Sequence, residues 1–400
     1  MSLQQLAIHG GTPVRTEPFP AWPIFGEEEE RLVLEVVRSG KWGGSNRNKL
    51  PEFEAQFSAM HVAKHAVTVV NGTIGLTIAL QASGVRPGDE VIMPPYTFIA
   101  TASCALLFGA IPVFVDVEPN SMLLDPELVE AAITPRTKAI IAVHIAGAPA
   151  NMNRLKEIAD KHGLRLIEDA AQGVGAAWDG HSVGALGDFG SFSFQSGKNV
   201  TSGEGGILLT NDEALADMAW SLANVGRVRN GAWYQHEHIG WNLRMTEFQA
   251  AILLAQLTRY DAQRELRDRN ARLLNERVRE IPGLRTLQLD SRVTKHAHHM
   301  FMFALDMEAV EGKITKDTFI RQMNAEGIPL LPGYITLNKN KAVLNEIEKW
   351  TGERRETSCP VSERFAEQEG LWLHQNVLLG SESDMDDIVR ALTKVIGASL

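Results

Sequence analysis

Short apolar segments alternate with stretches of helical periodicity over the first half of the chain. The strand-like segments are HAVTVV (65–70), EVIMP (90–94), IPVFVD (111–116), KAIIAVH (138–144) and LRLIED (164–169). Helices are expected from about residues 73, 97 and 151. Strands that alternate with helices indicate a largely parallel sheet covered on both faces. Ligand sites of such sheets lie at the carboxyl ends of the strands.

Other patterns flank this region. Residues 1–25 contain four prolines and two adjacent glycines, so we expect an extended arm there. Leucine and valine repeat at helical spacing from Glu27 to Ser39, and residues 41–53 follow as a connecting loop. A long helix is expected over 246–280, because its apolar face fades into charged residues as in a helix that connects two domains.

The last part of the chain mixes both kinds of element. Residues 300–307 (MFMFALDM) predict a strand, and helices are expected at about 315–326 and 384–397. We therefore expect an α/β protein divided into an N-terminal arm (1–25), a large domain (26–260), a connecting helix (261–282) and a small α+β domain (283–400).

Composition narrows the class of protein. The 400 residues are 44% hydrophobic, enough to bury a sizeable core. A net charge of −10 argues against nucleic acid or an anionic membrane surface as a partner. Cys104 and Cys359 give no disulfide framework, and the chain shows no signal peptide or membrane span, so a cytoplasmic protein is expected.

Lys198 is the candidate catalytic residue of the sequence. Phe192 and Phe194 alternate with serines in a strand-like segment, and Lys198 follows it within a glycine-rich loop. Asp169 ends another apolar strand. Such a pair suits pyridoxal 5'-phosphate, because a lysine amine forms a Schiff base with its aldehyde while an aspartate keeps its pyridine nitrogen protonated. Ser193 lies on the right strand to help hold the phosphate.

The segments SFSFQSGK…GEGG (191–206) and EDAAQ (168–172) resemble those of the DegT/DnrJ/EryC1/StrS family of aminotransferases, and the likeness covers nearly the whole chain. The resemblance implies the fold type I architecture of pyridoxal phosphate-dependent enzymes. It also implies that Lys198 carries the cofactor and then shuttles a proton during amino transfer.

The same resemblance implies further cofactor contacts. Gly72 and Thr73 open a helix after a strand and match the family's phosphate-binding positions. Phe98 matches the aromatic residue that stacks on the cofactor ring, and Gln172 matches a hydrogen-bonding residue near the ring hydroxyl. Asn242, in GWNLRMTE (240–247), matches a residue that reaches the cofactor phosphate of the neighbouring subunit, which implies a homodimer with shared sites.

Substrate contacts are expected from residues outside the cofactor set. Polar side chains outside the cofactor set are candidates for binding substrate: Asn46, Arg47, His299, Tyr334 and His374. At 224–227 the sequence reads Asn-Val-Gly-Arg where many relatives have His-Gly, so no substrate role is assigned to that position.

Three histidines close together raise the question of a metal. We interpret 296–299 as a strand in which His296 and His298 share a face and His299 points away. One ion would not collect all three side chains, so no metal is expected.

The function that follows from the resemblance is transfer of an amino group from L-glutamate or L-glutamine to a keto-sugar or keto-cyclitol, either free or linked to a nucleotide. Dehydratases of this fold carry histidine in place of the lysine, whereas Lys198 is present here. An aromatising synthase stays open, because Gln195, Gly197 and the AWP at 21–23 resemble that branch equally well. A regulator that binds the cofactor without turnover is the third alternative.

Overall fold

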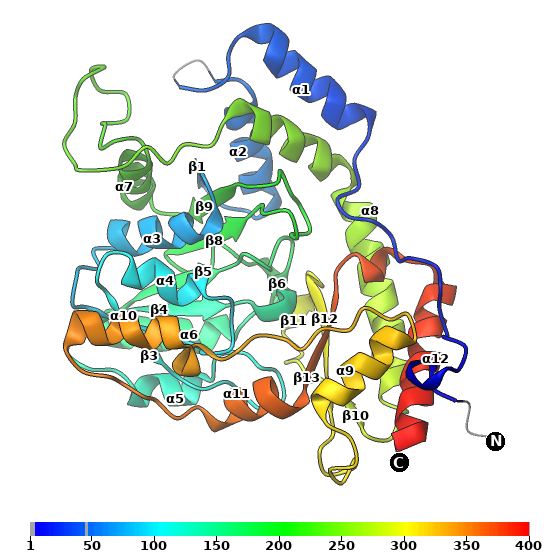
Figure 1. Ribbon diagram of the computed structural model, residues 1–400. Helices are drawn as coiled ribbons and strands as arrows, with labels where there is room; N and C mark the ends of the chain where they lie inside the picture. Colours follow the sequence, from blue (N-terminus) through cyan, green and yellow to red (C-terminus); the bar gives the residue numbers. More distant parts are fainter. Residues whose placement is uncertain (1–4, 45–46, 400) are drawn as a thin grey trace.

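The computed structural model describes residues 5–44 and 47–399, and a seven-stranded sheet forms its centre (Figure 1). Its strands are β1 (His65–Val69), β2 (Glu90–Met93), β3 (Ile111–Phe114), β4 (Thr137–Val143), β5 (Arg165–Asp169), β8 (Phe189–Ser193) and β9 (Gly206–Thr210). They lie in the order β1-β9-β8-β5-β4-β2-β3, and only β9 runs against the others. The expected α/β architecture with a largely parallel sheet is confirmed.

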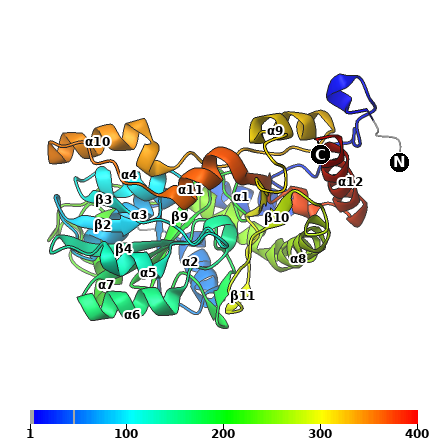
Figure 2. The ribbon, with the colours of Figure 1, turned by 90° about the horizontal axis from the view of Figure 1, so that it is seen from below.

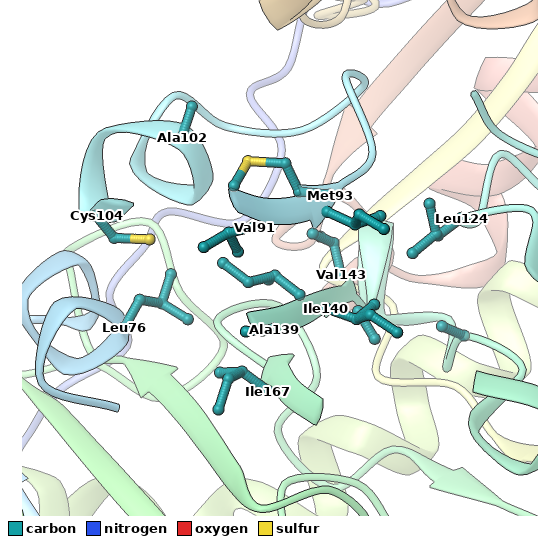
Figure 3. Close-up of a cluster of buried hydrophobic side chains, with 14 of the residues drawn as sticks. Leu76, Val91, Met93, Ala102, Cys104, Leu124, Ala139, Ile140, Val143 and Ile167 are labelled. Carbon is teal, nitrogen blue, oxygen red and sulfur yellow. The ribbon is translucent and has the colours of Figure 1, made fainter. Parts of the chain in front are cut away.

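Helices cover both faces of this sheet (Figure 2). α3 (Gly72–Ala82) and α4 (Ala100–Leu106) lie on one face, and α5 (Pro126–Ala131) and α6 (Met152–His162) lie on the other. α7 (Glu213–Ala223) packs against α3 and β1. Figure 3 shows Leu76 of α3 and Cys104 of α4 beside Val91 and Ile167 of the sheet, all buried. Burial on both faces explains the continuous apolar strand sequences.

A long helix, α8 (Glu247–Val278), runs along the side of the sheet and continues beyond it (Figure 1). α1 (Glu27–Ser39), which has the bounds expected from the sequence, packs against α8 together with α2 (Lys49–Met60). The prediction of a loop over 41–53 is wrong for its second half. Leu50, Phe53 and Phe57 repeat at helical spacing and are buried, and a proline is tolerated in the first helical turn.

The C-terminal part contains a second sheet, with β10 (Leu284–Thr286), β12 (Met300–Leu305) and β13 (Gly370–His374), all antiparallel. α9 (Lys316–Ala325) and α12 (Glu382–Ser399) accompany it, near the expected positions. α10 (Lys341–Thr351) and α11 (Pro360–Arg364) also belong to this part of the sequence. α10 packs against α4 and β3 of the large sheet instead of the second sheet. The division at residue 283 stays a prediction.

The remaining elements are short. A small sheet contains β6 (Ala177–Trp178), β7 (His181–Ser182) and β11 (Val293–Lys295). Single turns of helix lie at Ala7–His9, Ile145–Gly147, Leu337–Lys339, Phe365–Glu369 and Val377–Leu379. Among the described residues, no helix combines the length and apolar character needed to cross a membrane.

A buried carboxylate fastens the N-terminal arm to the C-terminal part. Glu326 is fully buried and accepts hydrogen bonds from the N–H groups of Ala7 and Val14, at 2.8 and 3.1 Å. The ammonium group of Lys394, on α12, lies 2.8 Å from the same carboxylate. Three segments far apart in the sequence therefore meet at one buried charge, which is costly to leave uncompensated.

We predict that Glu326→Leu loosens the arm and destabilises the protein. Removal of the carboxylate leaves the Lys394 ammonium with the carbonyl of Thr12 and no charged partner, and loss of one partner of a buried ion pair costs about 3–5 kcal/mol in comparable cases. Thermal unfolding and limited proteolysis measure the effect, and cleavage is expected first within residues 7–20. Glu311→Leu is the control, since Glu311 is exposed. Equal unfolding temperatures for the two variants would contradict this role of Glu326.

Candidate active site

Three strands bring their carboxyl ends to one edge of the large sheet. Asp169, the last residue of β5, lies opposite Ser191 of β8. Ser193 of β8 and Val69 of β1 both pair with Gly206 of β9. The loops that follow β1, β5 and β8 therefore start side by side, as the position of sites in such sheets requires.

Asp169 is buried at this edge and held by hydrogen bonds. Its carboxylate accepts one from the hydroxyl of Thr101 at 2.8 Å and one from the N–H of Ala171 at 3.3 Å. Burial raises the pKa of Asp169, while the Thr101 hydroxyl and the charge of Lys198 oppose that rise. A carboxylate so placed is oriented by its neighbours and needs a positive partner.

Lys198 lies in the tight turn that follows β8, where its N–H donates to the carbonyl of Gln195 at 2.9 Å. Burial lowers the pKa of the Lys198 amine to about 8, and the negative charge of Asp169 partly opposes this. The structure thus brings together the two residues expected to be catalytic. At neutral pH a useful fraction of this amine is uncharged and able to act as a nucleophile or a base.

The start of α3 approaches β8 closely. A Cβ atom at Gly72 would lie 2.9 Å from the Cβ of Ser193, so only glycine fits between the helix and the strand. Asn71 caps the helix by accepting the N–H of Ile74 at 2.9 Å. The N–H groups of Gly72 and Thr73 belong to the free first turn, which makes this end of the helix a suitable cradle for a phosphate.

Gln172, Tyr334 and Phe98 form the other side of the site. The Gln172 amide accepts the N–H of Ala146 at 2.7 Å and donates to the Tyr334 hydroxyl at 3.1 Å. Phe98 is 54% exposed, and its ring centroid is 6.3 Å from that of Tyr334. An exposed aromatic ring at the mouth of a buried polar site is available to pack against a ligand.

The histidines at 296–299 do not form the expected strand. β11 ends at Lys295 and β12 begins at Met300, so these residues connect the two strands, and His298 has a φ of 49°. His296 and His298 do lie on one side, with rings stacked 4.1 Å apart. Among the described residues, no group of three or more His, Cys, Asp or Glu side chains is arranged to hold a metal ion.

His299 faces the lysine, and its protonation is set by a neighbour. Its Nδ1 lies 3.0 Å from the Asn199 amide oxygen, while the amide nitrogen of Asn199 donates to the carbonyl of Ala297 at 2.7 Å. This network assigns the proton to Nδ1 and leaves Nε2 as an acceptor. Burial, together with the charge of Lys198, holds the pKa of His299 well below its usual value, so the ring is neutral.

Three predicted residues that the structure describes have no direct bond to the Lys198–Asp169 pair. His374 is exposed at the end of β13, where it pairs with Met300 and adds to burial and the charge of Lys198 in lowering the pKa of His299. Arg47 lines a small cavity with Arg244, and exposed Asn242 bridges to the backbone of Asn224. No hydrogen bond or ion pair in the described part of the chain joins any of the three to Lys198 or Asp169. Asn46 lies outside the described residues.

The sequence did not reveal several supporting residues. His144 follows β4 and donates its N–H to the carbonyl of Asp169 at 3.1 Å. Trp22, in the arm, donates its indole N–H to the carbonyl of Ser196 at 3.0 Å, beside Lys198. Thr101 and Asn199 act as described above. Only His144 could have been found from the sequence. It ends the KAIIAVH strand, and the end of that strand lies at the same edge of the sheet as Asp169.

Comparison with known proteins identifies the family. The model of the DegT/DnrJ/EryC1/StrS aminotransferase family matches residues 23–393. The chain belongs to this family. A putative L-glutamine:3-amino-2,3-dideoxy-scyllo-inosose aminotransferase from Streptoalloteichus tenebrarius is 41% identical, covering 98% of this chain and 97% of that protein. An L-glutamine:2-deoxy-scyllo-inosose aminotransferase from Streptomyces kanamyceticus is 39% identical, with the same coverage.

Solved structures agree with this membership. The crystal structure of 3-amino-5-hydroxybenzoic acid synthase superposes with a TM-score of 0.87 at 34% identity, covering 96% of this chain and 100% of that one. The DegT/DnrJ/EryC1/StrS member described here is therefore an aminotransferase, and its fold is that of type I pyridoxal phosphate-dependent enzymes. The expected family, fold class and enzyme class are confirmed.

We predict that Lys198 of the cofactor-free protein reacts with acetic anhydride along a titration curve with its midpoint at about pH 8. Only the uncharged amine reacts, so acetylation rises as pH passes through the pKa. Removing the negative charge in Asp169→Asn disfavours the ammonium form, and the midpoint is expected to move to lower pH. Peptide mass spectrometry measures both curves.

Exposed Lys41 in the same samples corrects for the pH dependence of the reagent itself. An unchanged midpoint, or a higher one, in Asp169→Asn would show that the two residues are not coupled.

Proposed function

We propose that this aminotransferase moves an amino group from L-glutamine to the ketone of a polyhydroxylated ring, a keto-cyclitol or a keto-sugar, with pyridoxal 5'-phosphate as cofactor. The observation that carries the proposal is that the Lys198 amine and the Asp169 carboxylate lie at the same edge of the sheet, close enough for each charge to shift the pKa of the other. The full-length relatives named for glutamine and scyllo-inosose substrates support the choice of donor and acceptor.

The donor groups present fit the cofactor. Asp169 offers the carboxylate that a pyridinium nitrogen requires, and Gly72, Thr73 and Ser193 offer N–H and hydroxyl groups for the phosphate. Phe98 supplies a ring surface. When bound, pyridoxal phosphate supplies an electron sink for the carbanion that forms when a substrate carbon loses its proton.

Lys198 moves the proton. With a pKa of about 8, roughly one amine in ten is uncharged at pH 7, compared with about one in several thousand for an ordinary lysine. An amine whose pKa lies near the working pH both accepts and returns a proton efficiently. The negative charge of Asp169 favours the protonated form of Lys198. It therefore opposes the effect of burial, and part of the lysine stays charged.

Neutral polar groups suit the acceptor. Gln172 and Tyr334 are linked by a hydrogen bond, and His299 presents an unprotonated Nε2. These groups bind ring hydroxyls without imposing a net charge, which matches an uncharged polyol better than a dicarboxylic keto acid. His374 and Arg47 are further candidates for substrate contact.

We also infer that the protein functions as a homodimer with shared sites, in a reducing, cytoplasmic setting that suits two free, buried cysteines. The segment between α7 and α8 exposes Trp233, Tyr234 and Ile239, and Asn242 follows it. Exposed apolar side chains concentrated on one segment favour coverage by a second copy.

Mixing two inactive variants is expected to restore activity if the sites are shared. In a heterodimer of Lys198→Ala and Asn242→Asp chains, one site combines the intact Lys198 with the intact Asn242. After full exchange at equal amounts, about a quarter of all sites are intact, because half the dimers are mixed and half their sites are good. Amination rates measure recovery.

Asn230→Asp, an equally exposed change in the same segment, is the control and is expected to stay active by itself. If native mass spectrometry verifies exchange and activity does not recover, Asn242 does not serve a neighbour's site.

For the proposed reaction, kcat/KM for a keto-inositol with labelled glutamine is expected to exceed that for oxaloacetate by at least about tenfold, because the neutral hydrogen-bonding groups favour a hydroxylated ring. Transfer of the label to the product, followed by mass spectrometry, is the measurement. A hundredfold preference for oxaloacetate would remove the cyclitol or sugar assignment.

Borohydride reduction of the loaded protein and peptide mapping provide the control for the cofactor, and the adduct is expected on Lys198. A labelled Lys198 with an aromatic amine as product would instead favour the aromatising synthase. A labelled Lys198 with no turnover of any acceptor or donor would favour a regulator.

A further inference from the structure

A second cavity, of about 440 Å³, lies between the C-terminal half of α8, β11 and β12. In Figure 1 these strands lie beside the lower part of α8, far from α1, α2 and the segment between α7 and α8. One part of its wall is apolar, formed by Ile145, Leu287, Leu289, Val293, Met300 and Met302, and the rest carries polar and charged side chains. The volume is within the range of small-molecule sites.

One backbone turn separates this cavity from the active site. Ala146 lines the cavity, yet its N–H donates to Gln172 at 2.7 Å and its carbonyl accepts the N–H of His299 at 2.8 Å. The turn has no room to spare, since a Cβ atom at Gly147 would lie 2.8 Å from that of Ala297. The cavity therefore borders residues of the active site without containing Lys198 or Asp169.

The rim of the cavity is positively charged. Its lining includes three cationic side chains, Arg264, Arg272 and Lys295, and one carboxylate, Asp268. That carboxylate is already engaged by Arg272 at 2.5 Å and by His298 at 3.2 Å. Arg264 reaches two carboxylates of its own helix only loosely, at 3.8 and 3.6 Å, and Lys295 is exposed.

The two histidines of the wall do not add to this charge. Burial lowers the pKa of both His296 and His298. Their stacked neutral rings present a flat surface instead, with an interplanar angle of 20°. A flat ring surface and an apolar wall beside cationic side chains are suited to an amphipathic anion of small size.

We propose that this cavity is a binding site for a small organic anion that carries an apolar ring, with the ring among the aliphatic side chains and the acidic group at the rim of Arg264, Arg272 and Lys295. This site is additional to the amino-transfer site and does not depend on the substrates proposed above. Because Ala146 contacts both, an anion bound there lies one residue from the contacts of Gln172 and His299.

Two probes with the same ring system test the charge requirement. We expect 8-anilino-1-naphthalenesulfonate to bind the pyridoxal phosphate-loaded protein at one site per chain in calorimetry with saturating glutamine present. N-phenyl-1-naphthylamine, which lacks the sulfonate, is expected to bind at least about tenfold more weakly in fluorescence titration, because it forms no charge-assisted hydrogen bond. Equal affinities, or no site with unit stoichiometry, would overturn the proposal.

Two kinds of variant locate the probe. Arg264→Gln with Lys295→Gln is expected to weaken binding of the sulfonate by about tenfold or more. The control is Arg321→Gln with Lys341→Gln, which removes the same charges from exposed positions elsewhere. Val293→Trp fills the cavity and is expected to abolish binding of both probes, with circular dichroism confirming that it folds. Sulfonate binding that survives either the charge variant or the filled cavity would overturn the assignment.

Discussion

The electrostatic attraction between partly buried Lys198 and buried Asp169 is the interaction on which the site depends. Burial acts on the two groups in opposite directions, lowering the pKa of the amine and raising that of the carboxylate, so each group becomes easier to neutralise. Each charge also offsets part of the cost of the other. The result is a lysine that exchanges protons near neutral pH. Such a pair works only if both side chains are held in place.

The sheet and a second buried carboxylate supply that restraint. Glu168 precedes Asp169, is fully buried, and accepts the N–H groups of Gly184, Leu186 and Gly187 at 2.7–2.9 Å. These residues lead into β8, so Glu168 ties the strand of Asp169 to the start of the strand that ends before Lys198. The ring of His144 completes the arrangement at 3.0 Å from Glu168. Three backbone donors stabilise this buried carboxylate.

Much of this arrangement was predictable from local pattern. The parallel strands, α1 and the placement of Lys198 and Asp169 at strand ends follow from periodicity and length. α2 escaped prediction because a proline and polar residues at its start masked the spacing of Leu50, Phe53 and Phe57. The 296–299 segment was misread because its sequence shows only that histidines alternate, whereas a positive φ at His298 breaks the strand.

Residues that act through tertiary contact left no sequence signal. Thr101 and Asn199 matter because of the side chains they meet, 68 and 100 positions away in the sequence. Asn242 and Arg47 are the opposite case, because the sequence suggested roles for them that the structure of one chain does not test. Those roles concern a neighbouring subunit or a substrate. Similarly, α10 lies between β12 and β13 of the second sheet in sequence but packs on the large sheet.

The continuity of α8 has a mechanical consequence. This helix runs without proline or glycine from Glu247 to Val278, contacting α1 and α2 near one end and α12 and β10 near the other. Helices bend sharply at proline, glycine or bulges, so α8 behaves as a stiff rod. A continuous helix that contacts both sheets therefore resists bending between the large sheet and the second sheet.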